Sequence, residues 1–173
     1  DGTSAGLVAV DAAGDWLLDL SGSPLANGIH AVTTQVMDTA GNRSILSGAA
    51  VITINSLPPN VPVITGILND TGDPDDAVTS DSTLLIQGSA DTGTDILVFV
   101  DGVQQGSTTT DAGGSWVFDN SATSLADGSY VITAIAENNV GLQSADSVGF
   151  NVLIDTVAPS LPVLVAIADD SAI

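Results

Sequence analysis

Residues 11–32, DAAGDWLLDLSGSPLANGIHAV, return 100 positions later as residues 111–132, DAGGSWVFDNSATSLADGSYVI. The agreement extends in both directions without a gap, and 22 of the 73 positions in residues 1–73 are identical in residues 101–173. A period of domain size defines the architecture of a chain before any strand or helix is assigned. The 173 residues therefore hold one complete repeat and two partial ones, which we place at residues 58–155, 1–57 and 156–173.

The complete repeat has the sequence of an all-β domain. Short stretches rich in Val, Ile and Thr alternate with clusters of Gly, Asp, Asn and Ser, and no segment keeps a helical apolar period. We predict seven strands, at residues 61–68, 83–89, 95–100, 104–110, 115–119, 129–137 and 145–154. The Asp-Gly pair at residues 101–102 predicts a tight hairpin turn.

Seven strands in about 100 residues predict a two-sheet sandwich of immunoglobulin type, and the period predicts tandem immunoglobulin-like β-sandwich repeats. The first, partial repeat is expected to hold the later strands of such a domain, at residues 5–10, 15–20, 29–37 and 45–54.

Several aromatic positions fit such a sandwich. Tyr130 stands where the tyrosine corner of immunoglobulin-like domains places a Tyr, two residues before a core position that is Ile132 here. His30 takes the corner position in the first repeat. Trp16 and Trp116 occur once per repeat at the same strand position, which favours core anchors over platforms that stack on carbohydrate.

The charge of the chain is strongly acidic and one-sided. Glu137 is the one Glu among 21 acidic residues, Arg43 is the one basic residue, and the net charge is −20. Such a surface repels nucleic acid and anionic membranes, so we expect neither as a partner. Asp favours turns and binds hard cations such as Ca²⁺, whereas Glu favours helices. The chain has no Cys and no apolar run of membrane length, so we expect no disulfides and place any targeting signal outside this sequence.

The densest acidic segment is NDTGDPDD at residues 69–76. Strands that alternate in direction would bring this loop, the 101–102 turn, the 119–127 connection and Asp155 to the end of the sandwich from which the chain leaves. Several Asp oxygens that converge from distant loops suit a cation with six to eight ligands. A solvated loop without an ion is the alternative. We predict a calcium site with the ligands Asp70, Asp73, Asp75, Asp76, Asp81 and Asp155.

Catalysis is not expected. His30 and Arg43 have no counterparts in the second repeat, and the chain has no Cys or Lys, so a nucleophile would lack a neighbouring base. The six aromatic residues are too few to form the cleft that a glycoside hydrolase with paired carboxylates needs.

Four motifs together resemble a known family: Asp-x-x-Gly-x-Trp, Leu-Ala-Asp/Asn-Gly before a strand, DTAGN at residues 38–42 and DTVAP at residues 155–159. In this order and spacing they resemble the bacterial immunoglobulin-like tandem repeats of large, calcium-dependent surface adhesins that Gram-negative bacteria export by type I secretion. The resemblance implies a secreted, cell-surface extender segment that supports cell adhesion or biofilm formation. Its partners would be calcium and the neighbouring repeats of the same polypeptide.

The chain departs from that pattern in two places, both at the junction between the first two repeats, and one of them is ENNVG at residues 137–141, where the first repeat has DTAGN. NSLPP at residues 55–59 stands where the second junction has DTVAP, so we expect ordered calcium near Asp155 and a weaker or absent ion near Asn55. Two other functions stay open at this point. One is a binding module whose loops contact a glycan or a host protein, and the other is a subunit of a surface layer or fibre.

Overall fold

Every regular element in residues 2–74 and 76–165, the part of the chain that this computed structural model describes, is a β-strand. The all-β prediction is therefore confirmed for these residues. The chain divides after Leu57 into two units, which are described separately as unit 1 and unit 2.

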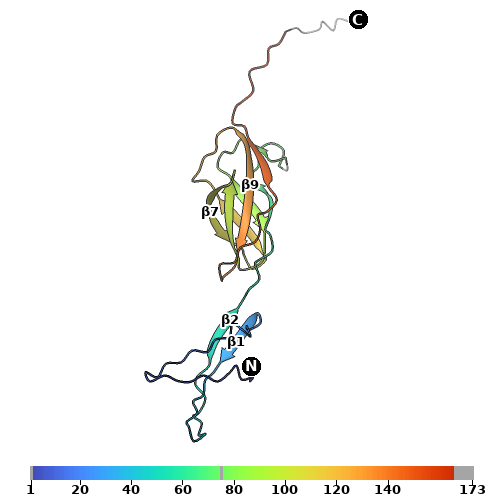
Figure 1. Cartoon of the computed structure of the whole chain (residues 1–173). Coiled ribbons are helices and arrows are strands. Elements are labelled where there is room, and N and C mark those ends of the chain that lie inside the picture. Colours follow the sequence, from blue (N-terminus) through green and yellow to red (C-terminus); the bar gives the residue numbers. More distant parts are fainter. Residues whose placement is uncertain (1, 75, 166–173) are drawn as a thin grey trace. The chain divides into compact units, whose positions relative to one another are not determined.

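Unit 2 is a sandwich of two sheets (Figure 1). The smaller sheet has the strand order β3-β5-β8, with β3 at Val63–Leu68, β5 at Leu85–Ser89 and β8 at Ser115–Asp119. The larger sheet has the order β4-β10-β9-β6-β7, with β4 at Val78–Thr79, β10 at Phe150–Ile154, β9 at Gly128–Glu137, β6 at Asp95–Val100 and β7 at Val103–Thr109. All neighbours are antiparallel except β4 and β10, which are parallel.

The core lies between the two sheets and follows the two-residue period of its strands. In β6, for example, Ile96, Val98 and Val100 are buried. Trp116 is 2 % exposed, and Ile132 is fully buried, as predicted for both. Trp116 pairs across the sheet with Gly88, where a Cβ atom would lie 2.3 Å from the indole ring. The anchor therefore depends on a glycine in the neighbouring strand.

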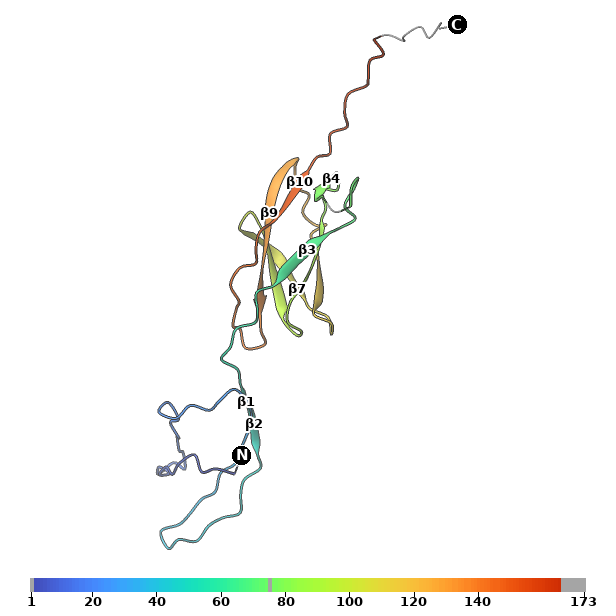
Figure 2. The same cartoon turned by 90° about the vertical axis from the view of Figure 1, so that its right-hand side faces the viewer.

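The first part of unit 2 passes from one sheet to the other (Figure 2). After β3 the chain forms a loop and then continues as β4, which pairs with β10 through the partners Leu153↔Val78 and Ile154↔Thr79. Asn69 and Ala77, at the two ends of this loop, have left-handed φ values of 59° and 56°. The sequence did not predict β4, because a strand of two residues has no measurable period.

The last predicted strand, at residues 145–154, is shorter than expected and spans only Phe150–Ile154. Residues 144–147 run beside β9, but their serine side chains replace part of the main-chain ladder. The Ala136 and Ala134 amides donate to the hydroxyls of Ser144 and Ser147, both at 3.0 Å. Serine hydroxyls compete with the backbone in this way, which explains why the strand begins later.

The strand registers place the acidic loop at the end of unit 2 where β10 finishes, which we call the exit end. Leu68 pairs with Leu85, which pairs with Asp119, while Ile154 pairs with Gly128. The 69–76 loop, the 119–127 connection and Asp155 therefore lie at one end, as the alternation of strands predicts. The chain enters unit 2 at the opposite end, which we call the entrance end.

Unit 1 contains one strand pair, β1 (Gly28–Val32) with β2 (Ala50–Ile54). Its register, Gly28↔Ile54, is that of Gly128↔Ile154 in β9 and β10. The strands predicted at residues 29–37 and 45–54 are thus present but shorter.

The strands predicted at residues 5–10 and 15–20 are wrong, because this part of unit 1 forms no strand. Their counterparts β7 and β8 pair with β6 and β5, and unit 1 holds no counterpart of those two strands. For the same reason Trp16, predicted to be a core anchor, is 50 % exposed. Residues 156–165 also form no strand, and the rest of the predicted third segment lies outside the described residues.

Candidate metal site at the exit end of unit 2

The aspartates of this chain serve first as turn formers. In the turn between β7 and β8, the Asp111 Oδ1 atom accepts hydrogen bonds from the Gly113 and Ser115 amides at 2.8 and 2.9 Å. Asp11 binds the Ala13 and Asp15 amides in the same way, both at 2.9 Å. The repeated Asp-x-x-Gly motif is therefore explained by turn geometry, because a short carboxylate reaches the backbone amide two residues ahead.

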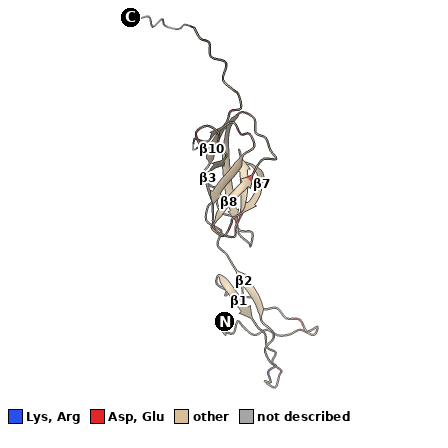
Figure 3. Ribbon diagram, turned by 180° about the vertical axis from the view of Figure 1, so that it is seen from behind, with Lys and Arg blue, Asp and Glu red and all other residues tan. Residues whose placement is uncertain are grey.

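Three of the predicted calcium ligands also hold their own loops. Asp76 Oδ1 accepts from the Val78 amide at 2.9 Å, and Asp155 Oδ1 accepts from the Val157 amide at 3.0 Å. Asp81 Oδ1 accepts from both the amide and the hydroxyl of Thr83, at 2.8 and 2.7 Å. Within residues 58–74 and 76–165, the acidic residues lie in loops and at strand ends (Figure 3). Each of these three carboxylates keeps its second oxygen for another partner.

Thr79 joins the segments of the exit end. It is 1 % exposed, and its carbonyl oxygen accepts from the Asp155 amide at 3.0 Å. Its hydroxyl accepts from the Asp81 amide at 3.0 Å and lies 3.2 Å from the Thr71 hydroxyl. Asp81 and Asp155 are thus held at β4 by one buried side chain and its carbonyl group. Sequence reasoning missed Thr79, because β4 itself has no signal.

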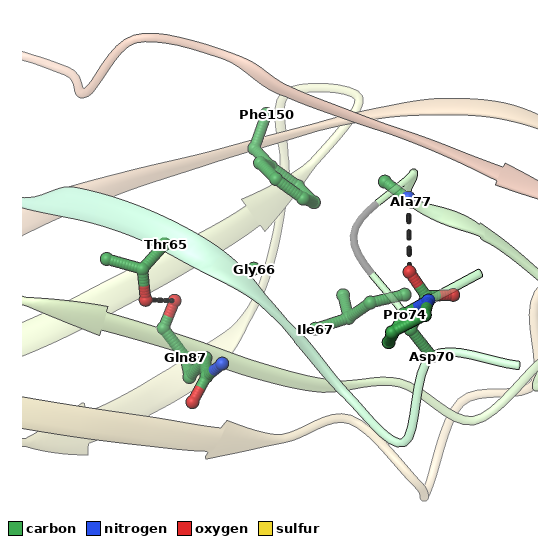
Figure 4. A pocket seen from close by; sticks show the side chains of 8 residues that line it. All are labelled: Thr65, Gly66, Ile67, Asp70, Pro74, Ala77, Gln87 and Phe150. Carbon is green, nitrogen blue, oxygen red and sulfur yellow. Dashed lines mark hydrogen bonds between the residues drawn. The ribbon is translucent and has the colours of Figure 1, made fainter.

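Asp70 carries the strongest indication of a missing partner. Its Oδ2 atom accepts from the Ala77 amide at 3.1 Å, but its buried Oδ1 atom has no hydrogen-bond partner among the described residues. The carboxylate lines a cavity of about 100 Å³ whose walls come from β3, β5, β10 and the 69–77 loop (Figure 4). The walls are formed by Thr65, Gly66, Ile67, Asp70, Pro74, Ala77, Gln87 and Phe150. A buried carboxylate oxygen without a donor is costly, and a cation or an ordered water would remove that cost.

The predicted ligands are brought to one end but not to one point. Asp70, Asp76, Asp81 and Asp155 lie around β4, and Asp73 is exposed in the loop. Asp75 lies outside the described residues. Within residues 2–74 and 76–165, no three acidic or His side chains are close enough together to hold a metal ion. The Asp70 oxygen fits a cation, and a complete ligand set needs further donors.

Among the described residues of unit 2, two carboxylates outside the predicted set have a pKa that hydrogen bonds lower. The hydroxyl and amide of Ser121 hold the pKa of the Asp119 carboxyl below its ordinary value. The side chain and amide of Asn60 do the same to the pKa of Asp91 in the loop between β5 and β6. Both groups stay ionised over a wider pH range than a free carboxyl group.

The corner predicted at Tyr130 is present. The Tyr130 hydroxyl donates to the Ala126 carbonyl oxygen at 3.0 Å, and in unit 1 His30 Nε2 lies 2.8 Å from the Ala26 carbonyl oxygen.

The family model of the bacterial Ig-like domain matches residues 59–156, more than half of the sequence. The chain belongs to the bacterial Ig-like domain family. The predicted family resemblance is confirmed at this level.

Two solved structures are among those similar to this chain. The fibronectin(III)-like modules of Clostridium thermocellum CbhA are 16 % identical, with a TM-score of 0.40, over 75 % of this chain and 64 % of theirs. A Ca²⁺-stabilized adhesin that helps an Antarctic bacterium bind ice is 22 % identical, with a TM-score of 0.44, over 87 % of this chain and 38 % of its own. The bacterial Ig-like chain thus spans less than two thirds of the length of either protein. No curated protein matches it. The described residues form no helix that could cross a membrane.

Proposed function

We propose that this bacterial Ig-like chain is an extender segment of a large secreted surface adhesin. In this proposal its tandem repeats of about 100 residues carry a distant binding domain away from the cell and support cell adhesion or biofilm formation. The observation that carries the proposal is the path of the chain through unit 2, which enters at one end and leaves at the other. A module of this kind adds its length to the polypeptide each time it is repeated.

The assignment of unit 1 as the C-terminal part of a repeat is part of the proposal. The shared register of β1–β2 and β9–β10 supports it, as does the exposure of Trp16 where Trp116 is buried. Residues 156–173 would then begin the next repeat. The proposed partners are neighbouring repeats outside the cell, with no enzymatic role.

Calcium is the proposed cofactor that stiffens the joints between repeats. Asp70 would anchor the ion through its unpaired Oδ1 atom, and Asp73, Asp75, Asp76, Asp81 and Asp155 would supply the other oxygens. Four or more carboxylates at one end of a domain repel one another, and a divalent cation relieves that repulsion. The joint at Asn55 has fewer charged ligands and is proposed to bind calcium more weakly or not at all.

Calorimetric titration of the chain with calcium tests this site. We expect Asp70→Asn to weaken calcium binding roughly tenfold, because the affinity depends on the number of charged ligands. Asp95→Asn, which removes an exposed charge at the entrance end of unit 2, is the matched control and should change the affinity little. Equal binding by magnesium, or equal affinities of the two variants, would refute a specific site at Asp70.

A further inference from the structure

The segment that joins β2 to β3 is held at its first residues by unit 1. The Asn27 Oδ1 atom accepts hydrogen bonds from the amide of Ser56 at 3.1 Å and from its hydroxyl at 2.8 Å. Asn27 lies in the turn before β1, so it is separated from Ser56 by 29 residues in the sequence. A side chain of unit 1 therefore fixes the direction in which the chain leaves β2.

The same segment is held at its last residues by unit 2. Both carboxylate oxygens of Asp91 accept from Asn60, at 2.8 Å from its amide and 3.0 Å from its side-chain nitrogen. A carboxylate that receives two hydrogen bonds makes a stronger and more directional contact than a single neutral pair. The low pKa of Asp91 agrees with this geometry.

The loop that carries Asp91 is itself well anchored. The main-chain carbonyl oxygen of Asp91 accepts hydrogen bonds from the hydroxyls of Thr94 and Thr110, at 2.7 and 3.1 Å, and Thr94 is 5 % exposed. Asn60 therefore binds a loop whose backbone is itself held by the residue before β6 and the residue after β7.

The first of these anchors recurs at the next joint with different residues. Asp127 Oδ1 accepts from the amide of Thr156 at 3.0 Å and from its hydroxyl at 2.8 Å. Asn27 and Asp127 differ in charge, and Ser56 and Thr156 differ by a methyl group, but the two hydrogen bonds are the same. What recurs is an acceptor oxygen in the turn and a hydroxyl residue after the strand. The anchor therefore depends on the acceptor oxygen and not on its charge.

Between the two anchors stand Leu57, Pro58 and Pro59. Each proline fixes its own φ, and each residue that precedes a proline is restricted to extended conformations. We propose that Asn27 and Asp91 are positioning residues that hold the backbone at Ser56 and at Asn60, so that the segment between β2 and β3 is ordered up to residues 57–59 from either side without a bound cation. The inference rests on the proposed extender function for its meaning, but its test uses no calcium.

Nuclear magnetic resonance of the ¹⁵N-labelled chain in the presence of a chelator tests the two anchors separately. We expect the ¹H–¹⁵N nuclear Overhauser effects of Ser56 and Asn60 to equal those of β2 and β3. Asn27→Ala should lower the value of Ser56 alone, and Asp91→Ala that of Asn60 alone, with roughly tenfold faster amide exchange at the released residue. Asn27→Asp should restore Ser56, because Asp127 makes the same bonds in the next repeat.

Two exposed residues that make no hydrogen bond in the described structure provide the controls. Asp146→Ala removes the same charge as Asp91→Ala, and Asn139→Ala removes the same amide as Asn27→Ala, and neither should affect Ser56 or Asn60. Unchanged chemical shifts in β6 and β9 show that unit 2 still folds in each variant.

A value for Ser56 or Asn60 in the unmutated chain that lies below those of β2 and β3, or values that Asn27→Ala and Asp91→Ala leave unchanged, overturns the inference. A failure to bind calcium would overturn only the proposed metal site.

Discussion

At the scale of single residues, the two tryptophans are a matched pair. Trp16 and Trp116 occupy the same position in the repeated motif, yet one is 50 % exposed and the other 2 % exposed. The exposures differ because Trp116 packs over Gly88 of the adjacent strand β5, whereas unit 1 has no strand that corresponds to β5. The two tryptophans therefore share a position in the sequence motif but not an environment in the structure.

We expect Trp116→Ala to lower the free energy of unfolding of unit 2 by about 3–5 kcal/mol, because it removes a large buried side chain and leaves a cavity. Trp16→Ala is the internal control and should leave that transition unchanged. Urea unfolding followed by circular dichroism measures both. If the two variants lose the same stability, the burial of Trp116 does not stabilise the fold.

The lowered pKa of Asp91 predicts that the free energy of unfolding depends on pH. Its pKa in the folded chain lies below the ordinary value because the Asn60 side chain and amide donate to it, whereas in the unfolded chain it is about 3.9. The ionised form therefore stabilises the folded state, fully above pH ~4, and this stabilisation is lost as the pH falls through the folded pKa. Asp91→Ala should reduce the difference in unfolding free energy between pH 7 and pH 3, whereas Asp146→Ala should preserve it. An unchanged difference in Asp91→Ala would show that the Asn60 contact is not formed in solution.

At the scale of elements, sequence patterns were reliable where a strand buries one face against the core and pairs with a neighbouring strand. The strand predicted at 115–119 is found with the same bounds, and the one at 95–100 likewise, because alternating burial reports directly on the core. Pairing, however, is a property of two strands. The pattern at residues 15–20 matches that of 115–119, but no partner strand is present and no strand forms.

The role of the acidic residues was less predictable than the strands. A cluster of aspartates has two uses, turn formation and metal binding, and the same residue types serve both. In Asp76, Asp81 and Asp155, one carboxylate oxygen accepts a hydrogen bond from the backbone amide two residues ahead. The spacing of the aspartates in the sequence does not predict which of them form such turns. The unpaired oxygen of Asp70 became visible only when the loop and its cavity were in place.

The missing partner strands lead to a test of the repeat assignment. Because residue 101 corresponds to residue 1, a second copy of residues 58–100 can be joined directly in front of residue 1 in the correct register. This fusion should bury Trp16, shift its fluorescence to shorter wavelength and add a cooperative unfolding transition, since it supplies counterparts of β3, β5 and β6.

The matched control carries Gly88→Leu in the added copy only. A side chain at this position collides with the indole ring and with the Val63 carbonyl oxygen, so Trp16 should stay exposed. If Trp16 remains exposed in the fusion without this substitution, unit 1 is not the second half of a repeat.

At the scale of the whole molecule, the net charge of −20 sets how ions act on the fold. Simple salt screens repulsion over distances beyond about 8 Å at physiological ionic strength, so it should raise the melting temperature gradually and then level off. Calcium in millimolar amounts should raise it further at constant ionic strength, and magnesium should not. Thermal unfolding in matched buffers separates the two effects. A melting temperature that follows ionic strength alone would favour the solvated acidic loop.

The passage of the chain from β3 to β4 has a consequence under tension. When unit 2 is pulled by its two ends, β3 is drawn one way and β10 the other, and the parallel pair β4–β10 lies between them. The hydrogen bonds from Leu153 to Ala77 and from Asp155 to Thr79 run across that pull, so both carry load at the same moment instead of opening one after another. Resistance to stretching then resides in the shortest strand of the domain, beside the acidic loop. An ion bound at Asp70 would hold this loop closed and raise the force at which the strand slips.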